Sequence, residues 1–197
     1  MGLFQKINEQ KQQRAEIEKA IKAAEDRVEE YKAMSEDEFR ALPDDEIYAA
    51  ALARTEEIVK LYDTPMEGFE ALDYERQIFY VTAHYEAEMS SGGMLKFLSG
   101  AGQSFATYML PCFEELGCEE HSDLFESFII RNNIDVNELS DFQVSNMQEY
   151  RYVSSKYPFG NYNEAYSNLP LLKPILTDYI RQNMDVFCIG VYDTNIQ

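Results

Sequence analysis

Two adjacent glycines, Gly92 and Gly93, interrupt a helical pattern near the middle of this 197-residue chain. A polar, acidic helix end precedes them, and an apolar turn follows at once. Adjacent glycines allow the backbone to adopt positive φ or to approach a neighbouring segment closely. We therefore expect a tight corner between two helical segments here rather than a flexible linker. The stretch carries no evident catalytic group.

The rest of the chain also reads as helical. Residues 3–33 contain no Gly or Pro and are rich in Glu, Lys, Gln and Ala, which predicts one long helix. A capping box at Ser35 and prolines at helix starts predict further elements. The expected helices cover residues 43–62, 70–90 (ended by the double glycine), 93–99, 103–116, 119–132 and 170–187. Pro111 should kink or break its helix, and Gly117 should cap the helix end.

These patterns predict an all-α protein, a compact multi-helix domain preceded by a long N-terminal helical arm. The expected divisions are an arm over residues 1–34, an acidic domain over residues 35–187 and a tail over residues 188–197. The tail is expected to be a short strand or an unstructured end.

The arm carries a coiled-coil seam in its C-terminal part, where apolar residues follow a 4-3-4-3 spacing. Ile7 fits the same seam, but Arg14 occupies one of its positions. Two interpretations stay open: an arm that lies on the domain, or a dimerisation arm or hairpin that would pair two copies through residues 3–33. The seam residues are Ile17, Ile21, Ala24, Val28 and Tyr31.

The chain is strongly acidic, with 36 Asp and Glu against 17 Lys and Arg and a net charge of −19. The arm is balanced, so the whole excess lies beyond residue 34. Such a charge disfavours nucleic acid or an anionic membrane as a ligand and favours a basic partner, cations or a well-solvated surface. Three cysteines, no signal-peptide pattern and no long apolar run indicate a cytoplasmic protein without a membrane segment.

The catalytic repertoire is thin. Only two histidines exist, and neither a nucleophile elbow nor a phosphate-binding glycine loop is present. His84 and Glu88 share a helix face but make two ligands at most, and Cys112, Cys118 and His121 lack a fourth ligand. The sequence therefore predicts no catalytic residue, no metal site and no cofactor, with buried cysteines acting as small apolar groups.

Acidic residues concentrate between residues 114 and 141, where Arg131 is the one basic residue. Glu115, Glu119, Asp123 and Glu126 would share one face if the helix continued through Gly117. A solvated face is the simpler interpretation, and a partner-binding face is the functional one. The candidate partner-binding residues are Glu114, Glu115, Glu119, Glu120, Asp123 and Glu126.

Several ordered segments resemble the family of the neisserial DNA-mimic protein, over roughly residues 70–187. Gly92 and Gly93 match a conspicuous double glycine of that family, and Phe97 matches an aromatic residue that follows it. Ser91, Met94 and Lys96 depart from the family pattern of Asn, Phe and Gln. The segments that carry the resemblance are 74–81, 86–102, 116–118, 163–166 and 171–183.

The resemblance implies an all-α, acidic, non-catalytic protein whose carboxylates imitate DNA phosphates and occupy a DNA-binding protein. The leading hypothesis is therefore an acidic interaction protein that binds a basic protein, as a DNA mimic. An immunity protein that neutralises a basic toxin nuclease is the alternative, and an uncharacterised enzyme is a third.

Overall fold

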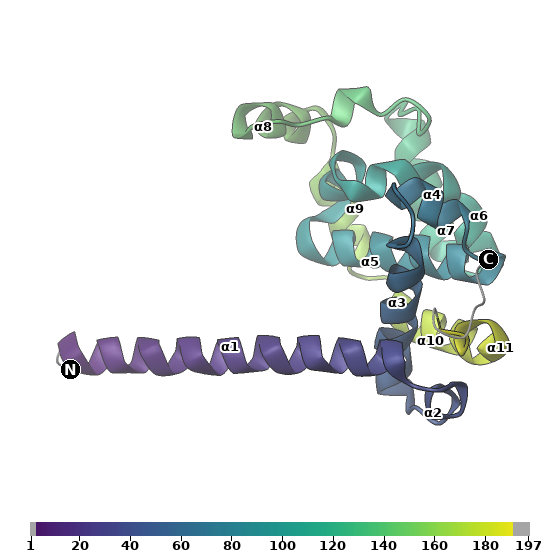
Figure 1. The fold of residues 1–197 in the computed structure, drawn as a ribbon. Coiled ribbons are helices and arrows are strands. Elements are labelled where there is room, and N and C mark those ends of the chain that lie inside the picture. The colour runs from purple at the N-terminus through teal and green to yellow at the C-terminus, as the bar shows by residue number, and fades with distance from the viewer. Residues whose placement is uncertain (1–2, 191–197) are drawn as a thin grey trace.

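A computed structural model describes residues 3–190, with the side chains of residues 10–190. Helices and no strands occur in this part of the chain, which confirms the predicted all-α class. The long helix α1 (Leu3–Ala33) projects from a compact body that holds the other helices (Figure 1). The body contains α2 (Glu36–Arg40), α3 (Asp44–Val59), α4 (Pro65–Glu70), α5 (Tyr74–Ser99), η1 (Ala101–Tyr108), α6 (Met109–Glu115), α7 (Glu119–Arg131), η2 (Ser140–Phe142), α8 (Met147–Lys156), α9 (Phe159–Tyr166), α10 (Leu172–Gln182) and α11 (Met184–Phe187).

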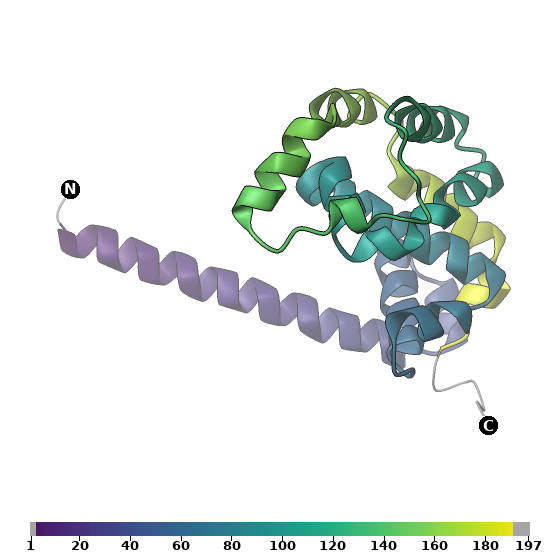
Figure 2. The same ribbon diagram turned by 90° about the horizontal axis from the view of Figure 1, so that it is seen from above.

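The arm does not lie on the domain, so the first of its two sequence interpretations is wrong. Every side chain from residue 10 to residue 30 is exposed, and Tyr31 is the first to be buried. The view from above also shows α1 pointing away from the body (Figure 2). The reason is chemical: most α1 side chains are charged or amide-bearing, so only its last turns offer a surface that the body can cover.

The base of the arm is fixed to α3 by charged contacts. Arg27 forms an ion pair with Glu46, and the Tyr31 hydroxyl donates to the same carboxylate at 3.1 Å. Lys32 Nζ lies 3.0 Å from a carboxylate oxygen of Glu57. These contacts hold the direction in which the arm leaves the body.

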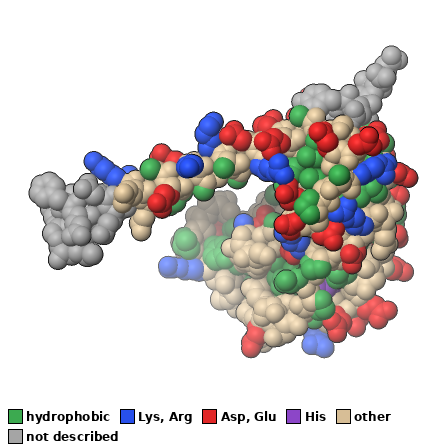
Figure 3. Space-filling model, turned by 90° about the horizontal axis from the view of Figure 1, so that it is seen from below, with side chains coloured by type: hydrophobic (Ala, Val, Ile, Leu, Met, Phe, Trp, Pro, Cys, Tyr) green, Lys and Arg blue, Asp and Glu red, His purple; other side chains and the backbone are tan. Residues whose placement is uncertain are grey.

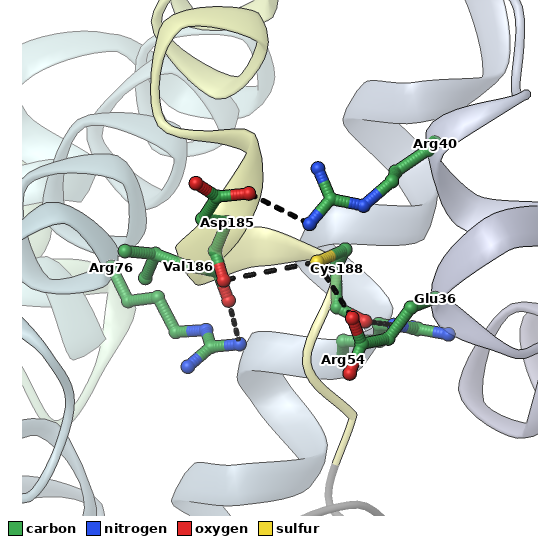
Figure 4. A network of polar contacts seen from close by, with 7 residues as sticks. All are labelled: Glu36, Arg40, Arg54, Arg76, Asp185, Val186 and Cys188. Atoms are coloured by element: carbon green, nitrogen blue, oxygen red, sulfur yellow. Dashed lines mark hydrogen bonds and ion pairs between the residues drawn. The ribbon is translucent and has the colours of Figure 1, made fainter.

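A buried arginine of α3 joins the arm base to the C-terminal end of the described chain. Arg54 is 1% exposed, and its Nε donates to the Tyr31 carbonyl at 3.0 Å. Its two terminal nitrogens donate to the carbonyls of Met34 and Cys188. The guanidinium also lies over the Phe39 ring of α2, 4.7 Å from the ring centroid. One side chain of α3 therefore binds both the base of the arm and the C-terminal segment, and Figure 4 shows Arg54 beside Cys188.

A second arginine secures the same C-terminal segment from the other side. Arg76 of α5 donates to the carbonyls of Val186 at 2.5 Å and Ile189 at 2.6 Å. It also pairs with Asp73 at 2.6 Å, just before its own helix. The chain after α10 is thus held by side-chain donors to its backbone, because it has no strand partner there within the described residues.

The central helix α5 carries the aromatic core. Tyr85 is fully buried, and its ring meets those of Phe97, Phe113 and Phe125 edge to face, with centroids 4.9–6.2 Å apart. Its hydroxyl shares a 2.6 Å hydrogen bond with the Tyr162 hydroxyl of α9. Such ring pairs stabilise beyond their area burial. This cluster positions α6, α7 and α9 around α5.

The expected corner is present, inside α5. Gly93 has φ 73° and ψ −167°, so the helix breaks there and resumes with an apolar turn. The Asn163 side-chain oxygen of α9 accepts from the Met94 backbone N–H at 3.0 Å and caps the resumed segment. A Cβ at Gly93 would lie 2.2–2.6 Å from the Asn163 side-chain atoms. Both the positive φ and the close approach require glycine here.

Other boundaries differ from the sequence expectations for local reasons. The helix expected over residues 103–116 is divided between Tyr108 and Met109, and Pro111 is the third residue of α6, a first-turn position where proline is tolerated. Residues 103–116 accordingly form η1 followed by α6. Gly117, with φ 65°, ends α6 as predicted. The expected helix 170–187 is α10 and α11, divided at Asn183, and the tail beyond Gly190 lies outside the described residues.

The corner supplies a stability prediction. Gly93→Ala should lower the free energy of unfolding by about 2–4 kcal/mol, since it adds backbone strain and a collision with Asn163. Asn163→Ala should cost about 1 kcal/mol through the lost cap. Urea denaturation followed by circular dichroism measures both. The control is Gly160→Ala, where a Cβ meets nothing within 4 Å. Equal stability of the Gly93 and Gly160 variants would contradict this account.

The buried Arg54 side chain supplies a second stability prediction. Arg54→Met should destabilise the protein by about 2–4 kcal/mol, because three backbone carbonyls, two at the arm base and one in the C-terminal segment, lose a buried charged donor. Limited proteolysis should show earlier cleavage near residues 31–36 and 186–190. Arg151→Met, on exposed α8, is the matched control and should change stability by less than about 0.5 kcal/mol.

Candidate protein interface

Helices α6 and α7 form a hairpin whose geometry follows from one turn. Gly117 takes a left-handed conformation, and the Cys118 N–H donates to the Phe113 carbonyl at 2.8 Å. This closes the end of α6 and turns the chain back so that α7 packs against α6. The two helices therefore present their acidic residues across a groove rather than along one continuous helix.

The groove has a volume of about 550 Å³. Leu110 and Pro111 of α6 give it an apolar wall, and Ser122 lies on the α7 side. Its carboxylates come from both helices: Glu114 from α6, and Glu119, Asp123 and Glu126 from α7. We call these four residues the acidic groove.

No basic side chain of the described residues pairs with the acidic groove. Within residues 10–190, none of its four carboxylates forms an ion pair. Acids elsewhere do: Asp44 pairs with Arg181 at 2.7 Å, and Asp185 pairs with Arg40 at 2.7 Å. On the face seen from below, red acidic side chains are spread over the body with blue ones among them, and the arm also shows both colours (Figure 3).

The single-face geometry expected from the sequence is not realised. It required the helix to continue through Gly117, and α6 ends at Glu115. Glu115 lies outside the groove lining and accepts a 3.3 Å hydrogen bond from the Tyr74 hydroxyl of α5. Glu120 is exposed and also outside the groove lining. The binding role of all six candidate acids stays a prediction, and the structure brings four of them together.

The sequence contains a signal for the α6–α7 pairing. Gly117, a helix cap, lies between two short amphipathic stretches, which is the pattern of a helical hairpin. By contrast, the Asn163 cap joins residues 69 positions apart, and the Arg54 hydrogen bonds join residues 20 to 134 positions apart. No local pattern signals such contacts.

His84 and Glu88 each contact other side chains of the body. The His84 ring packs against Tyr80, with centroids 4.2 Å apart, and Glu88 pairs with Lys96 at 3.1 Å. Burial lowers the pKa of His84 below its usual value. Among the described residues, no three His, Cys, Asp or Glu side chains converge as a metal site would require.

The Cys112, Cys118 and His121 set is likewise part of the packing. The three cysteines are free and buried. Burial raises the pKa of Cys112 to about 12 and that of Cys118 to about 11, so both stay protonated at neutral pH. His121 Nε2 donates to the Pro170 carbonyl at 2.9 Å, and its ring stacks on Phe113. Burial lowers the His121 pKa, which keeps the ring neutral.

Comparison with protein families gives one match. A family model described as "DMP19-like protein" covers residues 70–183, more than half of the chain and the part from the end of α4 to the end of α10. The resemblance inferred from the sequence is thereby confirmed. Neither the curated proteins nor the solved structures yielded a match. Over the described residues, no helix combines the length and apolarity needed to cross a bilayer.

The two histidines supply a pH prediction. Both have a folded-state pKa below the unfolded value of about 6.5, so their contribution to stability is complete above that pH. It is lost as the pH falls below about 6.5, because the unfolded chain then binds more protons than the folded one. Each histidine contributes a slope of up to about 1.4 kcal/mol per pH unit.

Urea unfolding of the wild type and of His84→Asn and His121→Asn variants measures this slope between about pH 7 and pH 5.5. Each variant should show a shallower loss of stability than the wild type, since asparagine does not titrate. The comparison is needed because burial raises the pKa of Glu86, which gives an opposite trend on acidification. Parallel curves for all three proteins would contradict the prediction.

Proposed function

We propose that this chain, which belongs to the family of DMP19-like proteins, is a non-catalytic binding protein whose acidic groove holds a basic protein. Its partner uses the same basic side chains to contact DNA, so the groove acts as a DNA mimic. The observation that carries the proposal is that four carboxylates converge on one groove. None of them is paired with a Lys or Arg side chain among the described residues.

The groove suits Lys and Arg side chains in particular. Their apolar stems can lie on Leu110 and Pro111 while their charged ends meet the rim carboxylates. Charge-assisted hydrogen bonds between guanidinium and carboxylate are short and strong, and the same guanidinium geometry serves phosphate. A side chain that evolved to grip a phosphate therefore finds an acceptable acceptor here.

The spacing of the carboxylates supports a short mimic. Glu119, Asp123 and Glu126 lie on one face of α7 and span about 10 Å along its axis. Phosphates of one DNA strand advance about 3.4 Å each, so this row alone is sparser than a strand. Glu114 across the groove adds a second row, as a duplex has two phosphate strands. The groove therefore fits a few basic residues of a partner rather than a whole DNA-binding surface.

The rest of the molecule favours this association. The charge excess of the body speeds encounters with a basic protein and opposes encounters with nucleic acid. Complementary charge raises the association rate, and salt screens it. Binding should thus weaken steeply as ionic strength rises.

The groove can be tested by removing its charge without changing its shape. The variant is Glu114→Gln, Glu119→Gln, Asp123→Asn and Glu126→Gln together. Affinity capture from a native lysate at low and high salt, with quantitative mass spectrometry, should enrich a basic DNA-binding protein on the wild type. The groove variant should lower the affinity for that protein by more than about tenfold. Added duplex DNA should displace it.

The matched control neutralises four exposed acids outside the groove: Asp63→Asn, Glu70→Gln, Glu164→Gln and Asp178→Asn. It has the same net charge as the groove variant, so it separates the groove from the overall field. Equal loss in both variants would show that net charge alone attracts the partner. If duplex DNA does not displace the bound protein, DNA mimicry is contradicted. The chain would then inhibit its partner at a surface other than the DNA-binding one, as an immunity protein does.

A further inference from the structure

The arm exposes an apolar stripe that the body leaves uncovered. Ile17 is 58% exposed, Ile21 is 53% exposed and Val28 is 38% exposed, all on the seam that the heptad spacing defines. Tyr31, the last seam residue, is already buried against the body. The free seam is therefore the stretch between residues 10 and 28, on a helix fixed at its base.

Basic and acidic residues are unevenly distributed along the arm. Residues 10–22 hold four basic and two acidic side chains, and residues 23–33 hold four acidic and two basic ones. The two bases of the second half are shared between the arm and α3: Arg27 pairs with Glu30 and Glu46, and Lys32 pairs with Glu29 and Glu57. The half of the arm near the body thus holds an excess of acids, and the outer half holds an excess of bases.

An open apolar strip runs along this acidic half. Ile21, Ala24 and Val28 form the strip, and acidic side chains border it. A fitting occupant is a helix with an apolar stripe and basic flanks. The outer half of the arm has that composition, with Ile17 on the stripe and Lys11, Arg14, Lys19 and Lys22 around it. The acidic border consists of Glu25, Asp26 and Glu29.

We propose that two copies of this chain pair through their α1 arms as an antiparallel coiled coil. The basic outer half of each arm lies along the apolar strip of the acidic inner half of the other. This inference concerns a surface separate from the acidic groove of α6 and α7 and does not depend on the proposed function.

Two charge effects favour the antiparallel orientation of the arms: repulsion between the two bodies and attraction between the halves of the arms. A parallel pair would place the two bodies side by side, and each body carries a large negative excess. An antiparallel pair centred near residue 19 holds the two arm bases about 36 Å apart, well beyond the screening length of about 10 Å at ordinary salt. It also sets the basic half of each arm beside the acidic half of the other.

The seam fixes the register. In an antiparallel pair the two kinds of seam position face each other, so Ile17 lies opposite Ile21 of the second copy. Arg14 then lies opposite Ala24, the smallest residue of the seam, which leaves room for its longer side chain. On the flank, Lys11 lies beside Glu25 of the second copy. The seam position that looked unfavourable in the sequence is thereby accommodated.

Light scattering and sedimentation of the full chain over a concentration series test the pairing. The wild type should be a dimer, and Ile17→Asp with Ile21→Asp should raise the dissociation constant at least about 100-fold, because both central layers become charged. Ile130→Asp is the matched control, an isoleucine 69% exposed on α7, and should leave the dimer unchanged. A monomeric wild type, or a dimer that survives the double substitution, overturns the proposal.

Charge exchange and distance measurement test the orientation. Lys11→Glu should weaken the dimer, and adding Glu25→Lys should restore it, since the pair is re-formed with reversed sign. Spin labels at position 11 should lie about 24 Å apart along the axis in the antiparallel pair. Labels side by side at about 10 Å would indicate a parallel pair and overturn the proposed orientation.

Discussion

The buried guanidinium of Arg54 is the contact on which the arrangement of the molecule depends. It lies on α3 and binds backbone carbonyls from the end of α1, from the turn before α2 and from the segment after α11. A buried charge of this kind is stable only when its donors are satisfied, so the arm base and the C-terminal segment must both meet α3 for the body to close. Because the same contacts seat the base of α1, the arm leaves the body in one direction, with its seam free.

A second constraint sets the interior. The corner at Gly93 lets α5 turn back on itself, and Asn163 of α9 replaces the backbone partner that the break removes. With this turn in place, Phe97 reaches the Tyr85 ring from the far side of the corner. The aromatic cluster then orients α6 and α7, whose hairpin carries the acidic groove. The position of the proposed interface therefore depends on the core, and the core depends on the turn at Gly93.

Charge is divided between the two parts of the molecule in different ways. The body has more acids than its bases can pair with, and several of its bases are used at structural joints such as Asp44–Arg181 and Asp185–Arg40. The groove of α6 and α7 is left without a cation as a result. The arm, by contrast, is neutral in sum but polar along its axis. The body is suited to attract a basic protein, and the arm is suited to pair with the arm of a second copy in antiparallel orientation.

The sequence by itself determined the helical class, the arm, the caps at Ser35 and Gly117 and the family resemblance, because each rests on local spacing and backbone preference. It could not tell that Pro111 falls in a first turn, where proline is harmless, since that depends on where the preceding helix ends. Nor could it tell that α1 stands away from the body or that Glu114, not Glu115, joins the α7 carboxylates. Only the tertiary structure decided these points, because burial, groove lining and the Arg54 contacts arise between residues that the chain brings together only when it is folded.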